Sequence, residues 1–267
     1  MRNSSKTTFI AFGALGGLLL AALILPIASL LLQANWITWT AAWKEEGARD
    51  ALYVSLTTSI VATAIMTVMG VPLSYVLARA GLPAKRFWIG LVFLPLVLPS
   101  LAGGILLMQL FGPYGWIGAP LASHGFEVTN SYAGIILAQI FVASPFIIIA
   151  SYSAFERVDP QLEMAAAILG DSRWQILRRV SLPLAWPGIA AGATLAWIRT
   201  LGEFGATLLV AYNPHTLPVY LWVKFESDGL HGALPLALLL LLLAVIAVIV
   251  SALLSRISGQ TGTAMVE

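Results

Sequence analysis

Six long apolar stretches are the feature that most constrains how this chain can fold. A helix needs about 20 mostly apolar residues to cross the hydrocarbon core of a bilayer. Membrane helices also tolerate internal glycine and proline, because neighbouring helices and hydroxyl side chains can bond the freed backbone groups. The sequence therefore predicts an all-α, polytopic membrane protein with six transmembrane helices. The six stretches are residues 8–32, 51–77, 87–111, 131–155, 184–210 and 231–254.

Composition favours this membrane assignment over a soluble fold of buried helices. Only 10% of the 267 residues are charged and 59% are hydrophobic, whereas soluble domains carry about 25% charged residues. So few charges cannot cover a globular surface of this size, and lipid must cover part of it. The first apolar run follows a polar start, as a signal peptide does, but no small-residue cleavage site ends it. We therefore expect a retained first span.

Basic residues are distributed unevenly between the two sides that six spans define. With the N-terminus inside, ten of the 14 lysines and arginines fall in inside segments, three fall in outside segments, and Arg199 lies within a span. Basic residues favour the cytoplasmic side, so both termini are predicted to be cytoplasmic. The ten inside residues are Arg2, Lys6, Arg79, Lys85, Arg86, Arg157, Arg173, Arg178, Arg179 and Arg256.

The outside segments, 33–50, 112–130 and 212–230, contain turn formers and aromatic residues. Tryptophan at such places marks the membrane interface; a docking surface for an outside partner is the alternative. The tryptophans of the first segment are Trp36, Trp39 and Trp43.

The loop between the fourth and fifth spans, residues 155–183, reads FERVDPQLEMAAAILGDSRWQILRRVSLP. Asp159 followed by Pro160 predicts the start of a helix, and Gly170 predicts its end. Asp171 or Ser172 can cap a second short helix that mixes apolar residues with three arginines. Two capped helices at a fixed bend predict a surface against which another protein packs.

This loop resembles the EAA loop of ABC-importer permeases, in which a coupling helix docks in a cleft of a cytoplasmic ATPase. The commonest spacing of that motif places glutamate six residues before the glycine, where this chain has Met164. Glu163 stands seven residues before Gly170, as in the molybdate branch of the family. The matching residues are Glu163, Ala165, Ala166, Gly170, Val180, Leu182 and Pro183.

The resemblance implies one membrane domain over residues 1–267 with the type I ABC-importer permease fold and a family core at about 51–254. It implies a homodimer in the lipid of a prokaryotic inner membrane, an extracytoplasmic substrate-binding protein, and no nucleic-acid partner. No G-x-x-x-x-G-K-[ST] motif is present, so ATP and magnesium belong on a separate ATPase and this chain binds no cofactor. The residues expected to couple to the ATPase are Glu163, Ala165, Ala166, Gly170, Asp171, Ser172 and Arg173.

The fifth apolar stretch contains AWIRTLGEFGATLLVA at 196–211. Its Leu-Gly-Glu-Phe-Gly run resembles the fifth span of permeases for molybdate, tungstate and sulfate, and FLPLVLPSLAGG at 93–104 resembles their third span. The sequence after Val210 departs from that branch, which leaves the transported anion open. The resemblance favours molybdate or tungstate, with sulfate, thiosulfate, ferric iron and phosphonate as alternatives.

Arg199 and Glu203 are spaced to meet on one helix face, and we place them toward the inner half of the span. An ionisable group inside a membrane costs about 2.5–3.5 kcal/mol on insertion scales, so the two groups are expected to pair. A structural ion pair and a direct role in the pathway both remain open. Gly188, Gly192 and Ala196 form a small-residue stripe suited to close helix packing.

An oxyanion pathway needs hydrogen-bond donors that do not trap the ion. The expected residues of the pathway or gate are Pro95, Pro99, Ser100, Arg199, Glu203, Phe204, Gly205 and Thr207.

Enzyme functions find little support in the sequence. The three histidines lie in separate regions and form no metal-binding frame, and no G-x-S-x-G motif is present. The function predicted is therefore a non-catalytic permease subunit of an ATP-driven oxyanion importer. A passive channel or a membrane-assembly protein is the alternative from another class, and an ATP requirement for uptake separates the two.

Overall fold

The computed structural model describes the backbone of residues 2–33, 40 and 44–263, and the side chains of residues 12–33, 40 and 44–250. Trp36, Trp39 and Trp43 lie outside these ranges. Within them every regular element is a helix. The helices are α1 (Arg2–Gln33), α3 (Glu46–Arg79), α4 (Lys85–Val97), α5 (Ser100–Phe111), α6 (Gly118–Ser123), α7 (Tyr132–Arg157), α8 (Pro160–Ile168), α9 (Arg173–Ile176), the π-helical η1 (Leu177–Ser181), α10 (Leu182–Leu201), α11 (Gly205–Val210) and α12 (Leu217–Thr263).

The prediction of an all-α polytopic protein is confirmed. Five helices of the described chain are long and apolar enough to cross a membrane, and the bent pair of α4 and α5 makes a sixth if it counts as one span. Two predicted boundaries are wrong. The fifth helical span runs from Arg173 to Leu201 and does not reach residue 210. Helix already begins at Leu217, inside the segment expected to be an outside loop, and only Gly229 (φ 64°) departs from helical geometry there.

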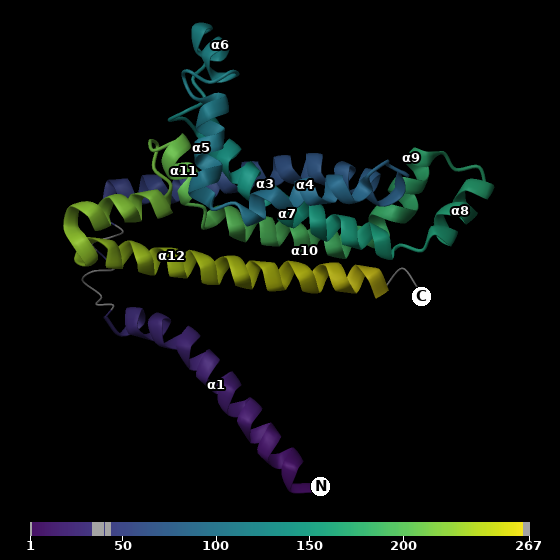
Figure 1. The fold of residues 1–267 in the computed structure, drawn as a ribbon, viewed down its shortest axis with the longest axis horizontal. Helices are drawn as coiled ribbons and strands as arrows, with labels where there is room; N and C mark the ends of the chain where they lie inside the picture. Colours follow the sequence, from purple (N-terminus) through teal and green to yellow (C-terminus); the bar gives the residue numbers. More distant parts are fainter. Residues whose placement is uncertain (1, 34–39, 41–43, 264–267) are drawn as a thin grey trace.

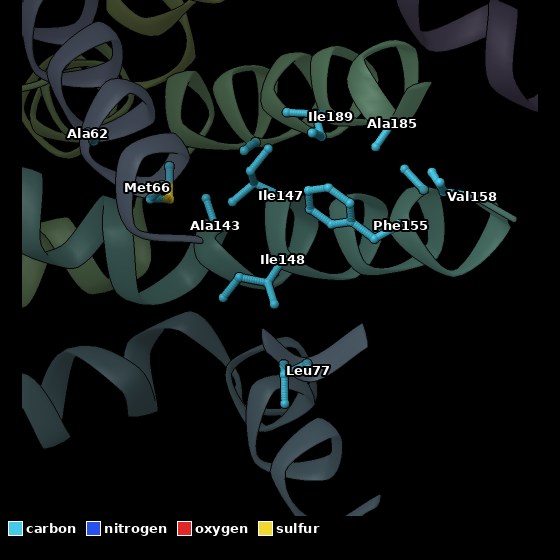
Figure 2. Close-up of a cluster of buried hydrophobic side chains, with 12 residues drawn as sticks. Ala62, Met66, Leu77, Ala143, Ile147, Ile148, Phe155, Val158, Ala185 and Ile189 are labelled. Atoms are coloured by element: carbon cyan, nitrogen blue, oxygen red, sulfur yellow. The ribbon is translucent and has the colours of Figure 1, made fainter. Parts of the chain in front are cut away.

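Helix α7 lies at the centre of the bundle, with α3 and α10 packed against it (Figure 1). Figure 2 shows the apolar core between these helices, where Phe155 and Ile147 of α7 lie against Ile189 of α10. The ring of Phe155 also meets Tyr75 of α3 edge-on at 5.3 Å between centroids. This core holds three long helices side by side, with α10 running opposite to α3 and α7, and the 155–183 loop lies at one end of the bundle (Figure 1).

Small residues let α10 approach α7 closely. A Cβ atom built on Gly192 would lie 2.6 Å from the Cβ of Ala150, and one built on Gly188 would lie 2.5 Å from the Cβ of Ala154. Ala196, the third residue of the predicted stripe, is fully buried in the same core. The stripe therefore serves helix packing, as its spacing predicts.

Replacing Gly192 with leucine is expected to destabilise the protein by about 1–3 kcal/mol, because the added side chain cannot enter the packed α7 and α10 contact without moving a helix. The matched control is Ala191→Leu, one residue earlier on the exposed side of α10. Thermal unfolding in detergent should show a lowered midpoint for Gly192→Leu alone. Equal midpoints for the two variants would contradict this packing.

A polar contact joins α3 to α12 at the end of the bundle opposite the 155–183 loop. Glu45 accepts a hydrogen bond from the hydroxyl of Tyr220 at 2.6 Å and pairs with Nζ of Lys224 at 2.6 Å. Burial alone raises the pKa of the Glu45 carboxyl, but the hydrogen bonds from Lys224 and Tyr220 outweigh it and lower that pKa below its ordinary value. The carboxylate is therefore charged at neutral pH and ties the two helices together.

Two parts of the chain extend away from the bundle. Helix α1 diverges from the other helices (Figure 1), and no residue in its membrane-span window is buried. Helix α5 turns by 109° from α4 and projects from the bundle with α6 at its tip. Apolar surface therefore remains uncovered on both segments.

Candidate functional site

The first helix of the 155–183 loop, α8, has the start and end that the sequence predicts. The Asp159 carboxylate accepts a hydrogen bond from the backbone N–H of Gln161 at 2.9 Å, and Pro160 occupies the first helical position. Gly170 adopts φ 95°, a left-handed conformation that favours glycine. Next to it, the N–H of Asp171 bonds the carbonyl of Ala166 at 3.1 Å, which closes the end of the helix.

A capping box begins the second helix of the loop. The N–H of Gln175 donates to the hydroxyl of Ser172, and the N–H of Ser172 donates to the side-chain oxygen of Gln175 at 2.7 Å. Of the two predicted caps, Ser172 is the one used; Asp171 instead pairs with Arg179 at 3.2 Å. The bend between α8 and α9 is thus fixed by hydrogen bonds on both sides.

Helix α9 continues into α10 through the π-helical segment η1. The N–H of Leu182 bonds the carbonyl of Leu177, five residues back. Pro183 follows and has no N–H to donate to the preceding turn. π-helical turns of this kind occur mostly as single turns within α-helices, frequently at functional sites.

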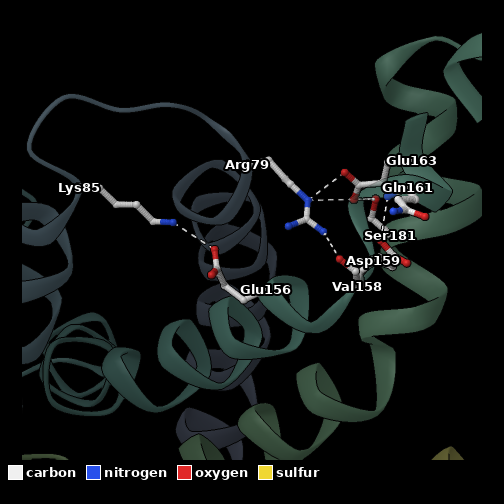
Figure 3. Close-up of polar contacts among 8 residues, drawn as sticks. All are labelled: Arg79, Lys85, Glu156, Val158, Asp159, Gln161, Glu163 and Ser181. Atoms are coloured by element: carbon white, nitrogen blue, oxygen red, sulfur yellow. Dashed lines mark hydrogen bonds and ion pairs between the residues drawn. The ribbon is translucent and has the colours of Figure 1, made fainter. Parts of the chain in front are cut away.

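Glu163 of α8 forms hydrogen bonds with other segments of the same chain (Figure 3). They belong to a cluster of four residues: Arg79, Val158, Glu163 and Ser181. Nε of Arg79 donates to both carboxylate oxygens of Glu163, at 2.9 and 3.0 Å. The Ser181 hydroxyl donates to the same carboxylate at 2.7 Å, and Nη2 of Arg79 donates to the carbonyl of Val158 at 2.8 Å. Only 18% of the Arg79 side chain and 14% of the Glu163 side chain are exposed. We call these four residues the Arg79 cluster.

The opposite side of α8 is apolar and open. Ile168 and Leu169 are each 86% exposed. Single exposed apolar residues are common on protein surfaces, but a contiguous group of them is not. Trp174 at the start of α9 is also exposed, but it lines a pocket with Val71, Pro72 and Phe155 of the bundle. We call the apolar side chains of α8 and its end the exposed apolar face; its members are Leu162, Met164, Ile168 and Leu169.

A second candidate region is formed by two breaks in the helices of the bundle. Helix α4 ends at Val97 and α5 begins at Ser100, with a 109° bend across Leu98 and Pro99. Helix α10 ends at Leu201, and α11 begins at Gly205. We call the two breaks, together with the contact between α5 and α11, the broken-helix junction.

Glu203 organises the second break. Its Oε1 accepts a hydrogen bond from the N–H of Ala206 at 2.9 Å, in the first turn of α11. Its Oε2 lies 2.8 Å from Nη1 of Arg199, which confirms the predicted ion pair. Glu203 is 1% exposed and Arg199 is 33% exposed. The pair lies at the last turn of α10, the end of that helix far from the 155–183 loop, so its predicted place in the half nearer that loop is wrong.

Helices α5 and α11 cross in direct contact at glycine positions. A Cβ on Gly205 would lie 2.3 Å from Oγ of Ser100 and 2.9 Å from the backbone nitrogen of Leu101. A Cβ on Gly104 would lie 3.0 Å from Cα of Ala206. Only a residue without a side chain fits where the two breaks meet, and the two half-helices depend on each other for their position.

Buried polar side chains lie beside this junction. The amide of Gln139 in α7 donates to the hydroxyl of Thr58 in α3 at 3.2 Å and lies 3.5 Å from the carbonyl of Thr200. Oε1 of Gln139 and Oγ1 of Thr207 are buried without a hydrogen-bond partner among the residues that the structure describes. Such groups are costly in an apolar interior unless a ligand, water or moving segment satisfies them.

Some of the predicted pathway residues lie at the junction, and others lie away from it. Ser100, Gly205, Arg199 and Glu203 lie at or beside the two breaks. Pro99 is exposed within the first break, and Pro95 is inside α4 before it. Thr207 is buried in α11, and the Phe204 ring lies 5.8 Å from that of Trp222 in α12.

The residues predicted to couple to an ATPase also differ in exposure. Ala165, Gly170, Ser172 and Arg173 are exposed, Ala166 is buried, and Asp171 is partly covered. Arg79 and Ser181 were not identified from the sequence as parts of the site. Arg79 counted only toward the charge bias, and nothing in the spacing of the chain connects it to Glu163.

Comparison with known proteins identifies the family of a chain with this fold and this loop. A family model of binding-protein-dependent transport system inner membrane components matches residues 70–258. The chain belongs to this family. It is accordingly a multi-pass inner-membrane component of a transport system, as its spans predict.

Three relatives of this inner membrane component are named as permeases of transport systems. A probable molybdenum ABC transporter permease protein of Haloferax volcanii is 42% identical over 239 residues, which cover 88% of this chain and 86% of the relative. A molybdate/tungstate transport system permease protein of Thermococcus kodakarensis is 36% identical, covering 87% and 90%. A probable sulfate transport system permease protein of Chlorokybus atmophyticus is 34% identical, covering 79% and 76%.

Solved structures confirm the fold of an ABC importer permease. A bacterial ABC transporter involved in alginate import superposes with a TM-score of 0.69 at 18% identity, over 92% of this chain and 95% of that chain. The MetNI methionine ABC transporter superposes with a TM-score of 0.63 at 19% identity, over 78% and 94%. At these identities the likeness concerns the fold alone.

Proposed function

We propose that this inner membrane component is the permease subunit of an ATP-driven importer for molybdate or tungstate, and that it works as a homodimer. The observation that carries the proposal is the 155–183 loop, a capped and bent pair of short helices whose exposed apolar face has no partner in the described chain. A separate cytoplasmic ATPase, which binds ATP and magnesium, docks on that face.

The chemistry of the exposed apolar face suits a protein partner. Its aliphatic and methionine side chains project from a helix that is already ordered, and the neighbouring arginines supply a polar rim. Protein interfaces have this composition, with an apolar core, a polar rim and an enrichment in methionine and arginine. The positive-inside distribution of basic residues supports a cytoplasmic position for this end of the bundle.

The broken-helix junction is the proposed gate of the pathway. Two half-helices meet there through glycine contacts. The ion pair of Glu203 with Arg199 fixes the geometry of the second break. When the ATPase subunits close, the 155–183 loops of the two permease subunits approach each other. The helices that follow these loops then move at this junction. An extracytoplasmic binding protein supplies the selectivity for the anion, because the arginine at the broken-helix junction, Arg199, is already paired with Glu203.

The identity of the anion rests on the relatives. Two of them are described as molybdate or molybdenum permeases at 36–42% identity, and the Leu-Gly-Glu-Phe-Gly run at Leu201 to Gly205 supports the same branch. Sulfate is the second candidate, because a sulfate permease is 34% identical. The two classes of anion differ in size but not in charge or shape, and a competition experiment separates them.

The proposal is tested by reconstituting the chain in liposomes with the ATPase and binding protein encoded beside it. We expect molybdate uptake to require ATP, and tungstate to compete with it far better than sulfate. Uptake that proceeds without ATP would identify a passive channel. Competition by sulfate alone would move the assignment to a sulfate importer.

Replacing Ile168 with glutamate should detach the ATPase. A buried charge at an interface anchor costs about 2 kcal/mol or more, which is roughly 30-fold in affinity. Co-purification of the ATPase with the detergent-solubilised permease measures the effect. Trp116→Glu is the matched control, since Trp116 is 90% exposed but lies beside α6, away from the loop. The docking assignment is wrong if Ile168→Glu retains the ATPase as well as this control does.

A further inference from the structure

Helix α8 is connected to the bundle chiefly through a single carboxylate. Ala166 is buried and Glu163 is largely buried, whereas the other side chains of α8 are exposed. A helix with so little apolar burial is positioned by its polar contacts. The contacts of Glu163 therefore decide how a displacement of α8 reaches the rest of the protein.

The Arg79 cluster connects four segments at this carboxylate (Figure 3). Arg79 is the last residue of α3, and it donates both to Glu163 of α8 and to the carbonyl of Val158, where α7 ends. Ser181, the last residue of η1 before α10, donates to Glu163 from the other side. Charge-assisted bonds of this kind are short and directional, and the planar guanidinium fixes the angle between its two acceptors.

We propose that Arg79 is a positioning residue of the transport cycle, which passes the displacement of α8 directly into α3. The inference rests on the proposed function, because it assumes that an ATPase moves α8. Helix α3 runs without interruption from Glu46 to Arg79 and spans the bundle from the Arg79 cluster to the end that holds the broken-helix junction (Figure 1). A displacement at its last residue is therefore passed to a helix that reaches that end.

The contact with α10 is of a different kind. Ser181 closes η1, and π-helical turns occur frequently at functional sites. Glu163 thus contacts α3 through its ion pair with Arg79 and the start of α10 through the Ser181 hydroxyl.

The register of α8 explains why Glu163 acts within the chain. Successive residues of an α-helix are about 100° apart. Met164 points away from the bundle and belongs to the exposed apolar face, while Glu163, one position earlier, points at Arg79. With its carboxylate bonded on both oxygens and only 14% of its side chain exposed, Glu163 has little capacity left for an outside partner.

The test measures how many anions enter per ATP hydrolysed, in liposomes that contain the permease, its ATPase and its binding protein. Arg79→Gln is expected to lower this ratio about tenfold, within the range of about 5- to 150-fold typical of coupling between sites. Co-purification of the ATPase should persist, because the exposed apolar face is untouched. Arg79→Lys keeps the charge but loses the two-armed geometry, and should give an intermediate ratio.

Lys85→Gln is the matched control. It removes another ion pair at the same end of the bundle, between Lys85 and Glu156 at 3.0 Å, which joins α4 to α7 and leaves α8 alone. The ratio for this variant should equal that of the wild type. If Arg79→Gln does not yield folded protein by gel filtration, Arg79→Lys replaces it in the test, and its intermediate ratio becomes the expected result.

Two results overturn the inference. The first is a wild-type ratio in Arg79→Gln, or in Arg79→Lys where that variant replaces it. The second is loss of ATPase binding in parallel with loss of uptake. The second result would make the cluster a support for docking alone. Failure of the proposed function looks different, since the wild-type protein itself would then retain no ATPase or need no ATP.

Discussion

Replacing Gly205 with valine is expected to abolish uptake and to lower the stability of the protein. The Cβ of any residue at this position would lie 2.3 Å from Oγ of Ser100 and 2.9 Å from the backbone nitrogen of Leu101. The serine hydroxyl can rotate away, but the backbone of α5 can move only by shifting the helix. Overpacking of this severity costs about 3 kcal/mol, and it separates the two half-helices of the broken-helix junction. Thermal unfolding and ATP-dependent uptake measure the two effects.

Gly202→Ala is the control for that variant. Gly202 lies in the same break, three residues earlier, but a Cβ there would have no heavy atom within 4 Å and its backbone does not require glycine. This variant should unfold at the wild-type temperature and transport normally. If Gly205→Val does the same, the contact between α5 and α11 does not hold the junction together.

Replacing Glu203 with alanine is expected to cost about 3 kcal/mol of unfolding free energy. The change leaves the Arg199 guanidinium without its partner and removes the acceptor for the N–H of Ala206. Removing one member of a buried pair costs about 3–5 kcal/mol, and the lower end applies because a third of the Arg199 side chain is exposed. Denaturant unfolding in detergent measures this loss.

Glu203→Gln separates the two parts of that cost. The amide oxygen can still accept the hydrogen bond from Ala206, so this variant should lose only the contribution of the charge and be more stable than Glu203→Ala. The double variant Arg199→Gln/Glu203→Gln should then be less destabilised than the sum of the single changes. Strict additivity would mean that the two side chains do not interact.

Local sequence patterns predicted the parts of the fold that depend on neighbouring residues. Apolar runs predicted the five continuous spans and the bent pair of α4 and α5. Asp159 with Pro160 predicted the start of α8, and Gly170 predicted its end. The spacing of Arg199 and Glu203 predicted their ion pair. Each of these features is decided by residues within a few positions of one another, where helix geometry relates sequence to space directly.

The broken-helix junction was less accessible from the sequence. Proline and glycine in residues 93–104 and 196–211 were expected as tolerated irregularities in continuous spans. The structure shows helix ends at Pro99 and Gly202, where contacts between α5 and α11 hold the two breaks together. Pro99 and Gly202 can be read from the sequence, but the packing around each of them decides whether the helix bends or ends there.

Contacts between distant parts of the chain could not be predicted at all. Arg79 and Glu163 are 84 positions apart, and Gln139 and Thr58 are 81 positions apart. Their meeting depends on how α3 and α7 pack, which no local pattern encodes. Arg79 therefore looked like one basic residue among ten, and its function became visible only when its two acceptors were seen.

The capping of the 155–183 loop has a consequence for how fast and how selectively a partner can bind. Ser172 with Gln175, Asp159 and the Arg79 cluster order α8 and the bend after it in the chain alone. A partner that docks on α8 therefore meets a rigid shape, and association does not have to order a flexible segment, which costs about 0.5–1.5 kcal/mol for each immobilised side chain. Recognition then depends on steric fit, so an ATPase from a different importer with a differently shaped cleft is excluded by geometry rather than by weak affinity.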